Sequence, residues 1–427
     1  MIVLLLAVPA KGSFENYTAG EEKNVLGHSY SEEYWTASSI NNTTADGATI
    51  EFAMSYVNKY NFQAFLVALK THTKDNVTST IPYQLFGMHY YTNDGREVGI
   101  GAIFAFLMAW NETNNNSLPD ANETKFYVYP WGAAEQNRDY TPEVSVLPVE
   151  KKNEDVYEFG MSYKNLYAFA FENPFAALLL RSGYFLKFDE LTIKYRVTFD
   201  KDSGVVKAET FYIIGQVRAL WAILLGVPVQ LTPDQIPPTM GIAAVHYVAT
   251  YTSGLQLANR TGSSVATNIT APTENLTLNS AGRKIFDIGF RGNYSTYDND
   301  TLLNENEPAV NAIIAAKPAD YALIAWQAGF SLGLFTYINY GISPDLRDRY
   351  NSPKDLLERG SVEFRESRMW YGVCFVKWHG KKIVHDPTYS AFFNPNPDLG
   401  KKGACGGAIL AAMLLSSVMI MVDRRKK

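Results

Sequence analysis

The strictest alternation of apolar and polar residues lies between Leu191 and Phe199, where every second side chain is apolar. Successive side chains of a strand point to opposite faces, so this segment is predicted to be a strand with one face in a core. Its partner is predicted at residues 205–214, across a polar turn that ends in Gly204. The pattern therefore predicts a long antiparallel hairpin in the middle of the chain.

Other strands are predicted wherever aromatic and β-branched residues concentrate. The run Thr92-Asn93-Asp94-Gly95 between two such segments is a strong hairpin signal. A proline directly after a serine predicts two short helices, at Ser343 and at Ser352. The further predicted strands cover residues 49–57, 62–70, 82–91, 98–110, 241–252, 284–290, 362–377 and 382–393.

One short pattern recurs. Glu-Phe-x-Met-Ser-Tyr occupies residues 51–56 and again residues 158–163, roughly 100 residues later, which is the size of one β-sandwich domain. A hairpin turn follows each occurrence at a similar distance. The predicted fold class is therefore mainly β, with tandem β-sandwich-like domains outside the membrane and few short helices. The predicted units are a first domain at residues 11–148, a second at 149–305, and a membrane-proximal β-rich domain with its stalk at 306–402.

Two apolar stretches need a separate interpretation. Residues 219–229 are too few to span a bilayer, so a buried strand or loop under the sandwich is predicted. Residues 322–341 carry no charge, but their polar residues and alternating aromatics favour buried strands over a membrane span. A second span would also place the basic C-terminus outside, against the positive-inside rule.

The C-terminal stretch 403–422 has no charged residue, and a helix of this length crosses the roughly 30 Å of a bilayer core. The basic tail 423–427 follows at once, which predicts a cytoplasmic C-terminus and an N-terminus outside. Residues 1–10 are interpreted as a signal peptide that lacks a basic start, so it is either incomplete or atypical. The chain is thus predicted to be a single-pass type I protein of the cell membrane. Small residues on the predicted helix favour packing against a partner helix: Gly403, Gly407, Ala408 and Ala412.

The composition agrees with a folded extracellular part, since 47% of residues are hydrophobic and only 19% are charged. The net charge of −5 argues against nucleic acid as a partner. The chain has only two cysteines, Cys374 and Cys405, and the second lies in the predicted membrane helix. An intrachain disulfide is therefore not expected.

N-glycosylation signals are more frequent than chance predicts, which indicates an exported protein with N-linked glycans on exposed loops. Twelve asparagines begin such a signal: Asn16, Asn41, Asn42, Asn76, Asn111, Asn115, Asn122, Asn259, Asn268, Asn275, Asn293 and Asn299. Many glycans, almost no cysteine and one terminal membrane helix resemble the layout of archaeal surface-layer glycoproteins. The resemblance is one of layout, and it implies no site residues.

No common catalytic motif occurs in the sequence, so no catalytic residue is assigned and a non-enzymatic role is favoured. The histidines His379 and His385 are more typical of ordinary surface or core positions than of a metal site. Adjacent carboxylates at residues 32–33 or 189–190 are the candidates for carbohydrate cleavage. Calcium is the candidate cofactor, and the ligands considered for it crowd one Asn-rich loop: Asp298, Asp300, Glu305 and Glu307.

The leading functional prediction is a structural or assembly protein of the cell surface. Its partners would be membrane lipid, N-linked glycans, and copies of itself or another membrane protein. One alternative is an extracytoplasmic accessory subunit of a membrane complex. The other is a carbohydrate-binding or carbohydrate-cleaving ectodomain, in which the many aromatic residues would stack on sugars.

Overall fold

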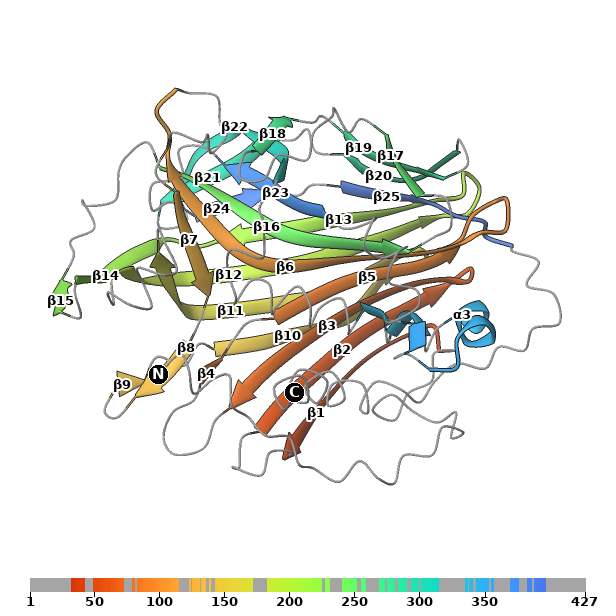
Figure 1. Cartoon of the computed structure of the whole chain (residues 1–427), viewed down its shortest axis with the longest axis horizontal. Coiled ribbons are helices and arrows are strands. Elements are labelled where there is room, and N and C mark those ends of the chain that lie inside the picture. The colour runs from red at the N-terminus through yellow and green to blue at the C-terminus, as the bar shows by residue number, and fades with distance from the viewer. Residues whose placement is uncertain are drawn as a thin grey trace.

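The structure is a computed structural model, and in the part of the chain that it describes the fold is mainly β, with antiparallel sheets and few short helices (Figure 1). Pairing connects 22 of the described strands, and a small separate sheet holds β4 (Ser79–Thr80), β8 (Gly132–Glu135) and β9 (Arg138–Asp139). The residues described are 32–42, 49–72, 79–80, 83–114, 123, 125–130, 132–135, 138–139, 143–171, 183–224, 227–230, 240–251, 255–258, 269–272, 275–280, 283–289, 293–298, 301–314, 335–336, 338–340, 343–352, 355–356, 369–375, 382–385 and 388–396.

The first layer, called sheet one, begins with consecutive strands that pair antiparallel as hairpins. It continues through strands from much later in the chain. In spatial order its strands are β1 (Tyr34–Asn42), β2 (Thr49–Lys59), β3 (Phe62–His72), β5 (Tyr83–Tyr91), β6 (Glu97–Asn111), β16 (Met240–Tyr251), β23 (Met369–Phe375) and β22 (Thr301–Ile314), with β18 (Ile269–Pro272) beside β22.

The second layer, sheet two, contains the hairpin predicted from the alternation. In spatial order its strands are β10 (Glu143–Asn153), β11 (Val156–Phe171), β12 (Gly183–Asp200), β13 (Val205–Ile214), β25 (Thr388–Phe392), β20 (Arg283–Gly289), β19 (Asn275–Ser280) and β17 (Leu255–Ala258). Short strands join the two sheets at their margins: β7 (Lys125–Pro130), β21 (Asn293–Asp298) and β24 (Lys382–His385).

The two sheets pack face to face. Phe86 of β5 stacks on Tyr195 of β12 with ring centroids 4.1 Å apart, although β5 pairs within its own sheet with β3 and β6. One hydrophobic cluster of buried residues has members from Val57 on β2 to Phe393 after β25. The three units predicted from the sequence therefore share a core within the described residues, while their boundaries stay predictions.

Part of the outer face of sheet one is also covered, by a helical segment that contains Phe335. The ring of Phe335 lies over Gly101, where an added Cβ would be 2.6 Å from it. Residues 335–336 and 338–340 are helical, so the preference for strands is wrong there. Local bonds explain the helix, because the Asn339 side chain donates to the Phe335 carbonyl at 2.7 Å and the Ser343 amide donates to the Asn339 carbonyl at 2.8 Å.

The serine caps predicted for the short helices are confirmed. Helix α3 (Pro344–Arg349) begins after Ser343, whose hydroxyl accepts from the Leu346 amide at 3.0 Å. The hydroxyl of Ser352 likewise accepts from the Asp355 amide at 3.1 Å. A serine oxygen satisfies an amide that has no partner in the first helical turn, which is why the signal is local enough to be found in the sequence.

The repeated pattern falls on β2 and β11, one in each sheet, and its methionines and tyrosines are buried in both. The two hairpin turns do not correspond, however. Both β3 and β5 lie between β2 and the turn at Gly95, whereas β12 alone lies between β11 and the turn at Gly204. The similar spacing arises because β12 has 18 residues, about as many as two ordinary strands.

Candidate functional site

The two ends of the sandwich differ in how their strands are connected. The end with the short connections is called the turn end. It holds the short connections at residues 60–61, 92–96, 154–155 and 201–204. Two of them contain glycines in the left-handed region, Gly95 with φ +80° and Gly204 with φ +66°. The last described residues also reach this end, because the Phe393 amide donates to the Gly204 carbonyl at 2.9 Å and the Asn394 amide to the Tyr91 carbonyl at 2.7 Å.

Lys59 joins the two sheets at the turn end. Its ammonium, on a side chain only 9% exposed, lies 3.0 Å from the carboxylates of both Glu154 and Asp155. Burial alone would lower the pKa of Lys59, but hydrogen bonds and charge from these carboxylates outweigh it and raise the pKa. The hydrogen bond from Lys59 in turn lowers the pKa of Asp155. The group is therefore a set of ion pairs that connects β2 with the β10–β11 turn.

Glu33, one of the carboxylates considered for carbohydrate cleavage, is engaged in the same region. It accepts hydrogen bonds from the Tyr157 hydroxyl and from Lys151, whose ammonium is 3.0 Å away. The bond from Tyr157, followed by Lys151, lowers its pKa. In the other candidate pair, Glu190 accepts from the Thr192 hydroxyl at 2.7 Å. Glu33 is thus held ionised as a structural acceptor, rather than raised toward the pKa of a general acid.

The outer face of sheet two carries a ladder of opposite charges. Glu158 accepts from Arg196 at 2.6 Å and from Lys194 at 3.2 Å. Burial raises the pKa of Glu158, but these bonds prevail and the pKa is lowered. The same two cations lie 4.8 Å from the ring centroid of Phe211. Since cations already occupy positions near this ring, Phe211 is not an open platform for a sugar.

Two histidines are buried in different surroundings. On β5, His89 lies between Gln63 Oε1 at 2.7 Å and Glu97 Oε1 at 2.6 Å. On β16, His246 Nε2 lies 2.7 Å from the Tyr212 hydroxyl inside the core. Burial lowers the pKa of His246 to about 3, so its ring is neutral at physiological pH. Neither histidine was singled out from the sequence, because nothing local distinguishes a core histidine from a surface one.

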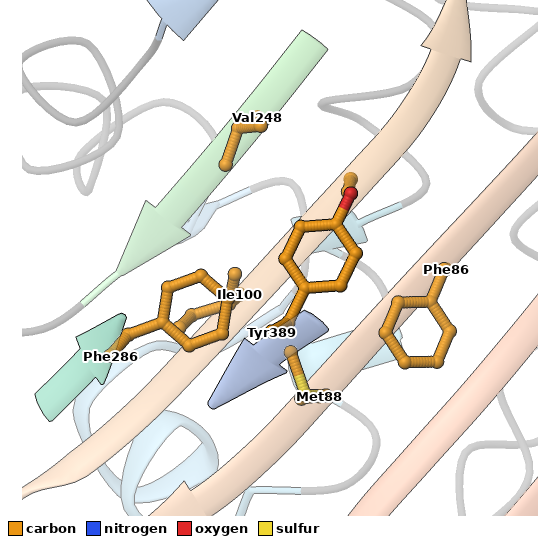
Figure 2. Close-up of a pocket in the computed structure, with 7 residues that line it drawn as sticks. Phe86, Met88, Ile100, Val248, Phe286 and Tyr389 are labelled. Carbon is orange, nitrogen blue, oxygen red and sulfur yellow. The ribbon is translucent and has the colours of Figure 1, made fainter. Parts of the chain in front are cut away.

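A small void lies between the sheets beside the Phe86–Tyr195 stack (Figure 2). Its volume of about 10 Å³ is near the minimum for a single water molecule. The lining is apolar apart from the Tyr389 hydroxyl, and Figure 2 shows that side chain among its neighbours from several strands: Phe86, Met88, Ile100, Val248 and Phe286. This void is a packing imperfection rather than a site for an organic ligand.

The opposite end of the sandwich, named here the loop end, is where β1 and β6 finish and where β12 and β16 begin. Three of the predicted glycosylation sites lie in the last two residues of strands there: Asn41, Asn42 and Asn111. Asn275 and Asn293 open β19 and β21. The other seven lie outside the described residues, and glycosylation at all twelve stays a prediction: Asn16, Asn76, Asn115, Asn122, Asn259, Asn268 and Asn299.

Two further strands extend the loop end into what is named here the flap, formed by residues 183–188 of β12 with β14 (Val217–Leu224) and β15 (Val227–Gln230). Figure 1 shows β14 and β15 projecting past the other strands. Val227 is 60% exposed and Val229 43% exposed. The prediction that residues 219–229 lie buried is therefore wrong for its last residues, because the hairpin carries them beyond the cover of the core.

The predicted calcium ligands fall on the β21–β22 hairpin. Asp298 pairs with Thr301 next to the turn, whereas Glu307 pairs with Tyr294, four residues further along β21. Four residues of strand measure roughly 13 Å, so the backbone does not bring these two positions to one point. Glu305 lies between them on β22, and Asp300 lies outside the described residues. Among the described residues no group of three or more His, Cys, Asp or Glu could hold a metal ion, and calcium stays a prediction.

In the described part of the chain, none of the helices has both the length and the apolar character needed to cross a bilayer. The predicted membrane helix at residues 403–422, with its packing residues Gly403, Gly407, Ala408 and Ala412, lies outside that part, as does His379. His385 ends β24 opposite Tyr212. Searches with this chain against protein-family models, curated proteins and solved structures gave no match. Its function has to be argued from geometry and sequence.

Proposed function

We propose that this chain is a membrane-anchored glycoprotein with a structural or assembly role at the cell surface, similar in layout to archaeal surface-layer glycoproteins. One observation carries the proposal: the chain leaves the sandwich toward the predicted anchor at one end, and strand-terminal glycosylation signals lie at the other. Phe393 and Asn394 are bonded to the turn end, and Asn41, Asn42 and Asn111 close strands at the loop end.

The short segment between the sandwich and the predicted anchor supports an orientation of the sandwich relative to the membrane. Only residues 395–402 separate Asn394 from the predicted membrane helix, and eight extended residues reach less than about 30 Å. The turn end would therefore lie close to the membrane surface. β6 has 15 residues, which measures roughly 50 Å, so the loop end and its glycans would be held well away from the lipid.

The interior suits a structural role. Large side chains that are fully buried fill the space between the sheets, among them Tyr157, Tyr163, Tyr195 and Tyr212. Charges at the turn end and on sheet two are paired within the molecule.

Topology and glycosylation can be tested together on intact cells that express the full chain. Ser203 is exposed in a turn at the turn end, so Ser203→Cys should react with a membrane-impermeant maleimide. A cysteine in place of Lys426 should react only after permeabilisation. Asn111→Gln should lower the intact mass by one glycan. Labelling of the tail on intact cells, or an intact mass without any glycan, would contradict the proposal.

The accessory-subunit alternative has its own outcome. Gentle detergent extraction should release assemblies of this chain alone, and addition of a calcium chelator would test the candidate cofactor. A foreign subunit at fixed ratio would instead assign the chain to a larger membrane complex. Glycan binding by the released protein would favour the carbohydrate alternative.

A further inference from the structure

The flap presents an apolar face. Tyr184 pairs with Ala222, and Ala222 pairs with Val229, so the register places Tyr184 and Val229 on the same face of the flap. Val227 lies two residues from Val229 and shares that face. Tyr184, Val227 and Val229 are 39%, 60% and 43% exposed, so half of the six large hydrophobic side chains identified as exposed in the described residues gather here.

This face continues the core-facing side of sheet two. Along β12 the alternate residues Leu186 and Phe188 are buried, and Tyr184 is the next residue in the same series. The flap therefore extends a surface made for packing beyond the edge of the core. The charged residues of the flap, Lys187 and Arg218, pair at its base, and none occurs between Ala219 and Gln230. Exposed margins of sheets normally carry lysine or other charges that prevent association, and the projecting part of the flap carries valines.

We propose that the apolar face of the flap packs against the same face of a second copy of this chain, side by side on the cell surface. The inference rests on the proposed function, because the anchor sets the orientation. Copies anchored through the turn end hold their flaps at one height above the membrane, so a two-fold axis along the membrane normal brings Tyr184, Val227 and Val229 of two copies together. Such an isologous contact needs no other complementary surface.

The same orientation argues against lipid as the occupant. The flap lies at the loop end, roughly 50 Å along the strands from the end that the anchor approaches. A lipid-binding hairpin would also gain from basic residues beside its apolar ones. The two basic residues of the flap, Lys187 and Arg218, are paired at its base, and the projecting stretch from Ala219 to Gln230 has none.

The contact is small, since three side chains on each copy bury only a few hundred Å², well below a standard protein interface. It would be weak between molecules in dilute solution. Anchoring in a membrane raises the local concentration and fixes the orientation, so a weak contact becomes effective. This is the regime expected of lateral contacts in a surface coat.

Cysteine cross-linking on intact cells tests the proposal, and a Cys405→Ser background removes the cysteine of the predicted anchor. Val229→Cys, with Val227→Cys as a second position, should form a disulfide-linked dimer of this chain under mild oxidation. Ser203→Cys at the turn end is the matched exposed control, and it should give severalfold less dimer. Adding Val227→Lys to the Val229→Cys chain should lower its dimer yield to that of the Ser203→Cys control.

The outcomes separate this inference from the proposed function. If the cysteines at 229 and 203 react with an impermeant maleimide on intact cells but dimer forms equally at both, the flap contact is refuted and surface exposure stands. If Val229→Cys links to a different protein, a foreign partner replaces the second copy. If neither cysteine reacts until the cells are permeabilised, the proposed surface location itself is overturned.

Discussion

The turn end and the loop end are built largely from the same strands, yet they differ in their connections, in their charge pairing and in the apolar residues that they expose. At the turn end, connections of a few residues bring Lys59, Glu154 and Asp155 together, and backbone bonds tie Phe393 and Asn394 to neighbouring turns. At the loop end, strands finish in glycosylation signals and a flap exposes valines.

The difference follows from how the chain connects its strands. A short turn fixes its side chains within reach of the next turn, so opposite charges can pair at a small entropic cost. The β14–β15 hairpin projects past the other strands (Figure 1), and Val227 and Val229 are exposed on it. Among the described residues, one end is thus held by ion pairs and backbone bonds, and the other exposes apolar side chains.

The largest expected loss of stability comes from a core substitution, which tests whether both ends of the sandwich depend on one core. Phe86→Ala removes the ring stacked on Tyr195, and it should lower the free energy of unfolding by about 3–5 kcal/mol. Phe211→Ala, on the half-buried outer face, should cost much less. Urea unfolding in detergent, followed by fluorophores on cysteines at 203 and 229, should show both ends unfolding at one lowered midpoint. Separate midpoints would mean that the ends are independent.

Acidification should weaken the core before it affects the turn end. In the unfolded chain His246 binds a proton below about pH 6.5, but in the fold it does so only near pH 3, so the unfolded state binds more protons between these values. Stability present above pH 6.5 should fall by roughly 1.4 kcal/mol per pH unit below it. Urea midpoints at pH 7, 6 and 5 should show a smaller slope for His246→Gln, and an unchanged slope would refute the assignment.

The turn-end carboxylates provide an internal check on that result. The hydrogen bond from Arg96 lowers the pKa of Asp94 to about 2, and Asp155 is lowered in the same direction by Lys59. Groups with lowered pKa contribute stability that is complete above their unfolded values near 4, and that is lost only in stronger acid. The slope between pH 5 and pH 6.5 therefore reports the histidine rather than these ion pairs.

Gly95 and Gly204 both have a positive φ, but only Gly204 is close to another part of the chain. Substituting each by alanine therefore distinguishes backbone strain from a steric clash at the turn end. A Cβ at Gly204 would lie 2.8 Å from the Phe393 carbonyl oxygen, whereas a Cβ at Gly95 would meet nothing within 4 Å. Gly95→Ala should cost about 1 kcal/mol from its positive φ alone, and Gly204→Ala about 2 kcal/mol or more. Equal losses in urea unfolding would show that the chain end does not depend on this turn.

The smallest effect concerns the ion pairs. Lys59→Met keeps most of the buried stem and removes the charge, and it should cost about 1 kcal/mol, since both carboxylate partners can still be hydrated. Lys152→Met, on a side chain 39% exposed, should cost less than Lys59→Met, because an exposed ion pair contributes little. Thermal unfolding of both variants would make the comparison, and a larger loss for Lys152 would contradict it.

The strands that were predicted have local signals, whereas others such as β1, β10 and β22 were not predicted. The alternation from Leu191 to Phe199 falls within β12, and the predicted partner at residues 205–214 is β13 itself. Gly95 ends the hairpin that Asn93 and Asp94 predict. The flap was misjudged because hydrophobicity in residues 219–229 indicates burial on average, without indicating whether a facing sheet extends far enough to cover it.

The sequence by itself determined a part of the strands, the hairpin turns at Gly95 and Gly204, the serine caps and the glycosylation signals, since each depends on residues a few positions apart. Only the tertiary structure decided that Lys59 meets Asp155, that Phe86 meets Tyr195, and that the chain leaves at the turn end. These contacts join residues about a hundred or more positions apart. Their partners are selected by how two sheets face each other, and no periodicity along one strand encodes that choice.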